Sequence, residues 1–66
     1  MKIKINGEFA EVSEGLSVFE YLEQNGFCLD RVAVEKDGEI LSKTLWKATN
    51  LSDGKSYEIV EFVGGG

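Results

Sequence analysis

The sequence predicts an α+β domain in which one helix packs across one face of a mixed sheet. Short runs of alternating polar and apolar residues indicate strands in both halves of the chain, and a single amphipathic segment in the first half indicates a helix. Asn-Gly and Asp-Gly dipeptides separate the strand candidates. With 66 residues, the chain is of a size that forms one small domain.

The first predicted element is a β-hairpin. Residues 2–5 alternate lysine with isoleucine, which places the two isoleucines on one face of a strand. The Asn-Gly dipeptide that follows accepts the positive φ angles of a type I′ turn, so the chain returns as a second arm. Phe9 and Val12 do not fall on the same face of that arm. We therefore expect a bulge near Ala10 or Glu11 that brings them together.

A helix is predicted to begin after Ser17. Ser17 and Glu20 have the spacing of a capping box, in which each side chain accepts a hydrogen bond from a backbone amide of the other residue. Val18, Phe19 and Leu22 recur at helical spacing and form an apolar stripe that can face the sheet. A second Asn-Gly dipeptide, with either residue able to adopt the left-handed conformation, ends the helix.

The second half predicts a strand pair, an irregular crossing and a last strand. Residues 32–36 and 39–41 are strand candidates on either side of an Asp-Gly turn. Residues 42–50 have no clean period, and we expect Leu45 and Trp46 within them to form a short helical turn or loop that fills the core. Residues 57–63 are apolar on both faces, which predicts a strand that is central in the sheet or exposes an apolar face to a partner.

This order of elements is that of the ubiquitin-like β-grasp fold. Residues 1–63 form the predicted domain, and residues 64–66 form a flexible glycine tail. In this fold the first and last strands pair in parallel at the centre of the sheet, which agrees with the nearly continuous apolar character of the last strand. A fold alone does not define a function.

Composition argues against several classes of function. Twelve acidic residues against seven basic ones give a net charge of -5, which disfavours nucleic acid and favours a basic protein partner. The chain has no histidine and one cysteine, so we expect no bound metal or cofactor and no catalytic site of its own. No apolar run is long enough for a signal peptide or a membrane helix. We expect a cytoplasmic protein that does not bind membranes.

Two further sets of residues are interpreted as non-catalytic. Cys28 lies between two apolar residues without a basic neighbour, so we expect a reduced, structural thiol that helps to cover the end of the core. The acidic residues of the first half are scattered and read as a solvated surface that steers a basic partner. They are Glu8, Glu11, Glu14, Glu20 and Glu23.

The chain ends in three glycines directly after the last predicted strand. Glycine adds no packing and loses the most backbone entropy when ordered, so stability gives no reason for such an ending. A frayed end is the plain alternative. A terminal carboxylate is a poor electrophile until it is activated, but a mixed anhydride with AMP would let sulfur displace AMP and leave a thiocarboxylate. Three extended residues without Cβ atoms reach roughly 10 Å into a narrow channel.

Over its whole length the chain resembles the sulfur carrier proteins of the thiamine pathway. The resemblance rests on the opening residues 1–7, on residues 32–35 and, most specifically, on the ending at residues 62–66. It implies that an E1-like adenylyltransferase uses ATP to activate the terminal glycine. It also implies that a persulfide protein, such as a cysteine desulfurase, supplies sulfur, and that thiazole synthase receives it.

The resemblance also assigns roles to the last five residues. Gly66 is the adenylate and thiocarboxylate site, Gly64 and Gly65 form the arm that reaches into the partner, and Phe62 and Val63 contact the partner enzymes. Three alternatives stay open. The small subunit of molybdopterin synthase has the same fold and the same chemistry, a ubiquitin-like modifier would join its terminal glycine to lysine, and a binding module would carry an inert tail.

Overall fold

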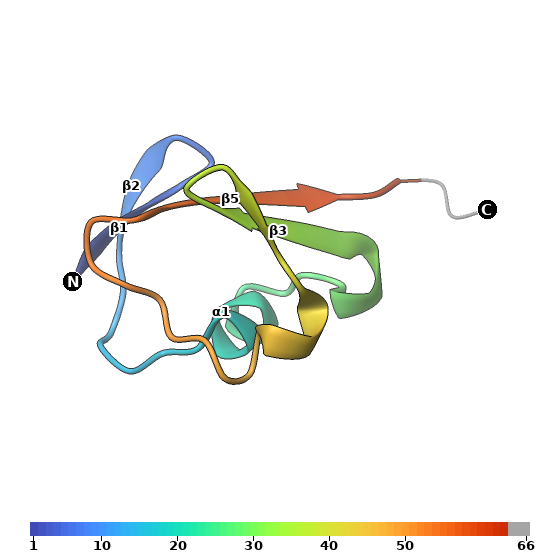
Figure 1. Ribbon diagram of the computed structural model, residues 1–66, viewed down its shortest axis with the longest axis horizontal. Coiled ribbons are helices and arrows are strands. Elements are labelled where there is room, and N and C mark those ends of the chain that lie inside the picture. Colours follow the sequence, from blue (N-terminus) through green and yellow to red (C-terminus); the bar gives the residue numbers. More distant parts are fainter. Residues whose placement is uncertain (64–66) are drawn as a thin grey trace.

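The computed structural model describes residues 1–63, and their elements follow the predicted order (Figure 1). One α-helix, two 3₁₀ turns and five strands are present in this part of the chain. The helical elements are α1 (Val18–Gln24), η1 (Leu29–Arg31) and η2 (Lys43–Leu45). The strands are β1 (Lys2–Ile5), β2 (Glu8–Glu11), β3 (Val32–Lys36), β4 (Glu39–Leu41) and β5 (Ser56–Glu61).

The five strands form one mixed sheet in the order β2-β1-β5-β3-β4. β1 and β5 run parallel at the centre, and the other neighbours are antiparallel. α1 lies against one face of this sheet, with η2 and the long connections of the chain on the same side (Figure 1). This is the β-grasp fold, so the fold prediction is confirmed.

Both predicted hairpin turns are observed, and the type I′ geometry expected for the first is present in both. Asn6 and Gly7 join β1 to β2 with φ angles of 51° and 83°. Asp37 and Gly38 join β3 to β4 with φ angles of 49° and 84°. Two successive positive φ angles define a type I′ turn, whose twist matches that of the flanking strands.

The predicted bulge in β2 is wrong. Ile3 pairs with Ala10 and Lys4 with Phe9 in an uninterrupted antiparallel register. Ala10 packs against the core, whereas Phe9 lies on the opposite face of the sheet and is largely exposed. The ammonium groups of Lys2 and Lys4 each lie 5.1 Å from the centroid of the Phe9 ring. Through these cation-π contacts Phe9, although it points outward, has partners on β1 that the sequence of β2 alone does not reveal.

α1 begins with the predicted capping box. The Ser17 hydroxyl accepts from the Glu20 N–H and the Glu20 carboxylate accepts from the Ser17 N–H, both at 3.0 Å. Val18 and Leu22 are buried against the sheet, and Gly26 follows the helix with a φ of 75°. Neither α1 nor any other helical stretch in residues 1–63 has the length and apolar character needed to span a bilayer.

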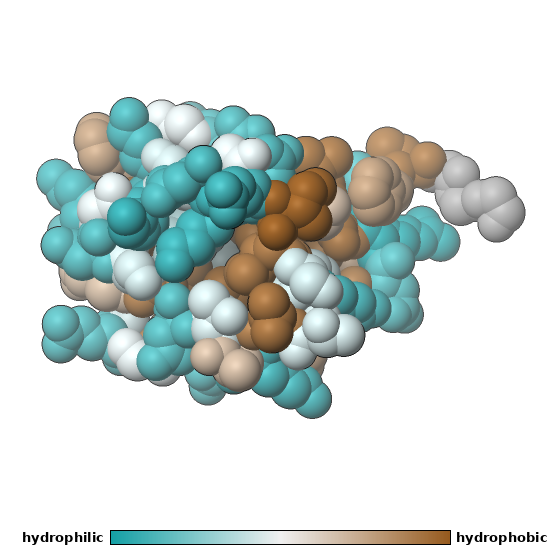
Figure 2. All heavy atoms as spheres, viewed as in Figure 1, coloured by the Kyte–Doolittle hydropathy of each residue, from teal (hydrophilic) through white to brown (hydrophobic). Residues whose placement is uncertain are grey.

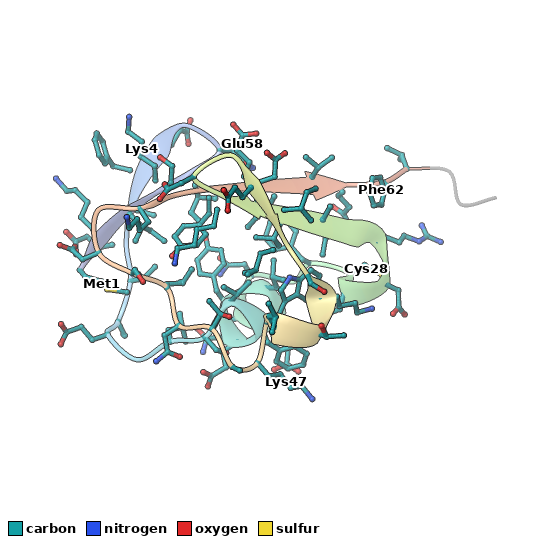
Figure 3. All side chains as sticks on the ribbon, viewed as in Figure 1. Met1, Lys4, Cys28, Lys47, Glu58 and Phe62 are labelled. Carbon is teal, nitrogen blue, oxygen red and sulfur yellow. The ribbon has the colours of Figure 1, made fainter. Side chains whose placement is uncertain are left out.

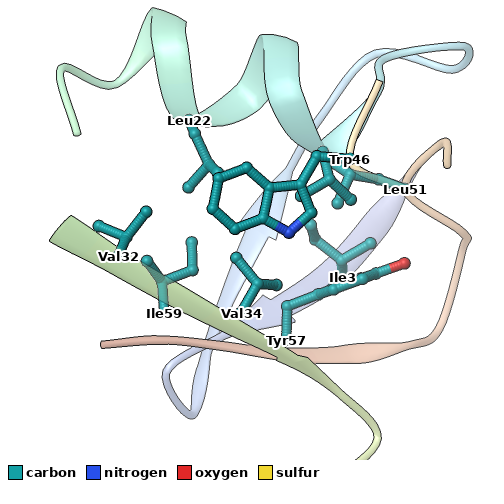
Figure 4. Packing of buried hydrophobic residues seen from close by; sticks show 9 residues of the cluster. Ile3, Leu22, Val32, Val34, Trp46, Leu51, Tyr57 and Ile59 are labelled. Atoms are coloured by element: carbon teal, nitrogen blue, oxygen red, sulfur yellow. The ribbon is translucent and has the colours of Figure 1, made fainter. Parts of the chain in front are cut away.

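The core lies between α1 and the sheet, and Trp46 fills its centre as predicted. The expectation that Leu45 shares this role is wrong, because Leu45 is 50% exposed at the end of η2. The side chain is 2% exposed, and its indole N–H donates to the Leu41 carbonyl at 3.0 Å. Figure 4 shows the indole between Leu22 of α1 and Val34 of β3. The buried hydrophobic cluster consists of Ile3, Val18, Leu22, Val32, Val34, Trp46, Leu51, Tyr57 and Ile59.

Cys28 is exposed, so its predicted place in the cover of the core is wrong. Its backbone is extended, with φ of -80° and ψ of 107°. Because neighbouring side chains alternate along an extended chain, Phe27 and Leu29 turn toward the core and Cys28 turns away.

Candidate functional site

The candidate site begins where the central strand leaves the sheet. The predicted last strand, residues 57–63, is observed as β5 at Ser56–Glu61, and β5 ends at the side of the molecule from which the chain projects (Figure 1). Phe62 still donates its backbone N–H to the Arg31 carbonyl at 2.6 Å, so pairing on the β3 side continues one residue past the strand. Val63 is 95% exposed.

Three of the five predicted site residues lie outside the described residues. They are Gly64, Gly65 and Gly66, so their assigned roles stay predictions. The other two, Phe62 and Val63, lie together at the end of β5 with exposed side chains.

An apolar patch occupies the face of the sheet opposite α1, which we call the open face. β5 contributes Val60, 47% exposed, and the chain directly after it contributes Phe62, 59% exposed. Ile40 of β4 is 76% exposed and points to the same face, because its neighbour Leu41 packs against the core. We call Ile40, Val60 and Phe62 the apolar patch. Figure 2 shows apolar side chains gathered along the molecule toward its C-terminal end.

β5 therefore meets both alternatives of the sequence prediction. It is central in the sheet, with Tyr57 and Ile59 buried on the α1 side. Its other face leaves Val60 exposed, as a surface that a partner can cover.

Acidic side chains border the apolar patch. Glu58 of β5 and Glu35 of β3 are direct cross-strand partners on the open face, and Glu58 projects away from α1 (Figure 3). Glu61, at the end of β5, points to the other face of the sheet, on the side of Tyr57 and Ile59. None of the three has a basic group within 4.0 Å among residues 1–63. Like charges opposite one another destabilise a sheet, so the Glu35 and Glu58 pair has no evident role in stability.

The end of β1 contains a contact that sequence reasoning missed. The Asn6 side chain donates to the Ile59 carbonyl at 3.3 Å and accepts from the Ile59 N–H at 2.8 Å. The side-chain amide of Asn6 thus pairs with the backbone of β5 at Ile59, beyond the last residue that the backbone of β1 pairs with. The sequence shows Asn6 only as a turn residue, because its partner lies 53 positions away.

No metal site is apparent in residues 1–63, where no three His, Cys, Asp or Glu side chains are grouped to hold an ion. What residues 1–63 present here is an exposed strand end with an apolar patch and an acidic border. Such a surface can bind a protein that presents apolar and basic side chains.

Comparison with known proteins finds one family over nearly the whole chain. The model of the ThiS family matches residues 3–66. A crystal structure of the thiamine biosynthesis protein (ThiS) from Geobacter metallireducens superposes with a TM-score of 0.84 at 35% identity, with both chains covered in full.

Curated relatives include proteins of two lengths. The thiazole synthase of Paramagnetospirillum magneticum is 39% identical over 66 residues, which are all of this chain and 20% of that protein. The uncharacterized protein ycf40 of Pyropia yezoensis is 38% identical over the same length, which is 93% of that protein. The chain thus spans about one fifth of the length of the thiazole synthases that it matches.

Proposed function

Because the chain belongs to the ThiS family, we propose that it is a sulfur carrier of thiamine biosynthesis. In this proposal the Gly66 carboxylate is adenylated by an E1-like enzyme and converted to a thiocarboxylate that donates sulfur to thiazole synthase. The observation that carries the proposal is the family match through residue 66, which includes the terminal glycines. The chain acts as a co-substrate and not as an enzyme.

The proposed chemistry takes place on one carbon atom. The Gly66 carboxylate attacks the α-phosphorus of ATP, and pyrophosphate leaves to give the acyl adenylate. The terminal sulfur of a persulfide, supplied by a protein such as a cysteine desulfurase, then displaces AMP and forms an acyl disulfide. A thiol cleaves the S–S bond, which leaves the thiocarboxylate on Gly66 and a disulfide on the protein that supplied the sulfur.

The described domain serves as the handle for this chemistry. The apolar patch and its acidic border lie next to the residues that lead into the tail, where a partner enzyme would grip the carrier. Phe62 and Val63 are proposed as direct contacts because they are exposed at that position. Thiazole synthase is supported as the acceptor because relatives of that name contain a stretch similar to this entire chain.

Intact-mass spectrometry tests the proposal. The chain is incubated with the E1-like enzyme from the same genome, ATP and a persulfide donor. We expect a mass increase that corresponds to replacement of one oxygen by sulfur, located on Gly66 by fragmentation. Gly66→Ala should fold normally but react poorly, because the added methyl group crowds a narrow channel. Absence of the exchange in the parent chain would refute the carrier proposal, and a lysine conjugate would assign the chain to the modifiers instead.

A further inference from the structure

β5 is longer than β1, the strand that pairs with one of its two sides. β1 pairs with β5 only at Lys4 with Ser56 and at Ile5 with Tyr57, after which the chain turns away. On the other side, β3 stays paired with β5 as far as Glu61. The last part of β5 therefore has a complete neighbour on one side only, and Figure 1 shows it running past the β1–β2 hairpin.

Hydrogen bonds show which backbone groups of β5 face β3. Phe62 donates its N–H to the Arg31 carbonyl at 2.6 Å, and the Ser56 carbonyl accepts from the Asp37 N–H at 2.8 Å. In an antiparallel pair, residues whose backbone N–H and carbonyl bond to the neighbouring strand alternate with residues whose backbone groups point away from it. The even-numbered residues of β5 thus face β3, and the odd-numbered ones face the β1 side.

Contacts on the β1 side agree with this alternation. The Tyr57 carbonyl accepts from the Asn6 N–H at 2.9 Å, and the Ile59 N–H and carbonyl bond to the Asn6 side chain. Glu61 is next in the series. Its N–H and carbonyl have no backbone partner on this side among residues 1–63, and the residue is exposed. We call these two groups the free edge.

We propose that the free edge takes up an extended segment of thiazole synthase, which adds as a strand beside the end of β5. The inference rests on the proposed function, in which that enzyme receives the tail. Only Phe62 and Val63 separate the free edge from the tail in the sequence, so pairing at Glu61 would hold the strand from which residues 64–66 continue. Strand addition supplies affinity through main-chain hydrogen bonds and specificity through the alternating side chains.

The surroundings of the free edge define the chemistry of the incoming segment. Val60 and Phe62 flank Glu61 in the sequence and expose apolar side chains on the open face. Glu61 itself is an exposed acid whose side chain points to the other face of the strand. An extended segment that alternates apolar and basic residues matches this pattern, because its apolar side chains would cover the apolar patch on the open face while a basic side chain on the other face pairs with the Glu61 carboxylate.

A second copy of this chain is a poor occupant of the same edge. Each copy carries a net charge of -5, and antiparallel pairing about Glu61 would place like charges opposite one another. A charged residue at an exposed edge is a common means of preventing such self-pairing.

Amide exchange measured by NMR on the ¹⁵N-labelled full chain tests the proposal directly. In the free protein the Glu61 amide should exchange quickly while the Phe62 amide is protected by its bond to Arg31. Addition of thiazole synthase from the same genome should slow exchange at Glu61. A complex in which Glu61 exchanges as fast as in the free chain would overturn the proposal. The proposal would also be overturned if the E1-like enzyme slowed exchange at Glu61 and thiazole synthase did not. The same holds if a higher concentration of the carrier, with no enzyme present, slowed that exchange.

A matched pair of variants separates the backbone from the side chain. Glu61→Pro removes the N–H of the free edge and fills its place with the ring, which an edge position tolerates. It should weaken binding to thiazole synthase about 10-fold, whereas Glu61→Ala, which keeps the N–H, should weaken it by no more than about 3-fold. Retained protection of the Phe62 amide serves as the check that each variant is folded. Equal losses in the two variants would contradict strand addition.

Sulfur transfer measured by mass in the same samples keeps the two proposals apart. Transfer to thiazole synthase without protection of Glu61 would overturn the free-edge proposal and leave the carrier function standing. Failure of the parent chain to bind thiazole synthase would overturn the free-edge proposal together with the choice of acceptor.

Discussion

Asn6 combines two requirements that few other residues meet. Its φ of 51° belongs to the left-handed region, which asparagine and glycine tolerate best. Its side-chain amide supplies both a donor and an acceptor, and Ile59 uses both. Asn6 therefore turns the chain away from β5. At the same time its side chain satisfies the backbone N–H and carbonyl of Ile59, which the turn would leave without partners.

Replacement of Asn6 by glycine should isolate the contribution of the side chain. Glycine adopts the same positive φ without strain, so in the folded state Asn6→Gly removes only the two bonds to Ile59. The added freedom of glycine in the unfolded chain is a cost that the control variant below shares. We expect the free energy of unfolding to fall by about 1–2 kcal/mol in urea titrations. Asn25→Gly is the matched control, because the Asn25 amide makes a single exposed bond to Tyr21 and should cost less. Equal losses would show that the Ile59 contact adds nothing.

The exposure of Cys28 has a direct chemical consequence. A disulfide reagent such as DTNB should titrate one thiol in the folded protein without denaturant, because the side chain is open to solvent. Replacement by serine should change the free energy of unfolding by less than about 0.5 kcal/mol, as for other surface positions. A reaction that occurs only as fast as the protein unfolds would contradict the exposed position.

At the scale of elements, the β3–β4 turn is joined to the start of β5 by one carboxylate. Asp37 accepts from the Ser56 N–H at 3.0 Å, and Lys55 lies 3.5 Å from its other oxygen. The hydrogen bond from Ser56, together with the charge of Lys55, holds the pKa of Asp37 below its ordinary value of 3.8 and outweighs the opposing effect of desolvation. The ionised form therefore favours the folded state.

This carboxylate predicts an acid-sensitive contribution to stability. Because the pKa of Asp37 is lower in the folded than in the unfolded chain, its contribution is complete above pH 3.8 and disappears as the pH falls through the folded value. Asp37→Asn should be less stable than the parent at neutral pH, and the difference in the free energy of unfolding should shrink as the pH falls below 3.8. Urea titrations over this range provide the measurement. A constant difference would mean that the charge of Asp37 is not involved.

Elements with a local signal were predictable from the sequence, and contacts between distant segments were not. The capping box of α1 and the type I′ turns depend on residues within four positions of one another, so their patterns are complete in the sequence. The outward Phe9 depends on two lysines of another strand, and Asn6 depends on Ile59. Of the candidate site, Phe62 and Val63 were predicted from the resemblance carried by residues 62–66, whereas the free edge at Glu61 follows only from the different lengths of β1 and β5.

Across the whole molecule, the two faces of the sheet have different roles. One face and α1 enclose the buried cluster, with Trp46 between them. The open face carries the apolar patch and the paired acids Glu35 and Glu58 close to the end of β5. Stability is thus concentrated on one face, which leaves the other free to meet partners.

We therefore expect the Glu35 and Glu58 pair to lower the free energy of unfolding and to raise the rate of association with a basic enzyme partner. Glu58→Lys places a basic side chain opposite Glu35, so the free energy of unfolding should rise by about 0.2–1 kcal/mol in urea titrations. The same change reverses a charge next to the apolar patch, so association with a basic enzyme partner in stopped-flow experiments should slow, most clearly at low salt. Glu14→Lys makes the same change of net charge in an exposed loop and should affect the association rate less. If the two variants slowed association equally, net charge alone would steer the encounter, and the acidic border would have no specific role.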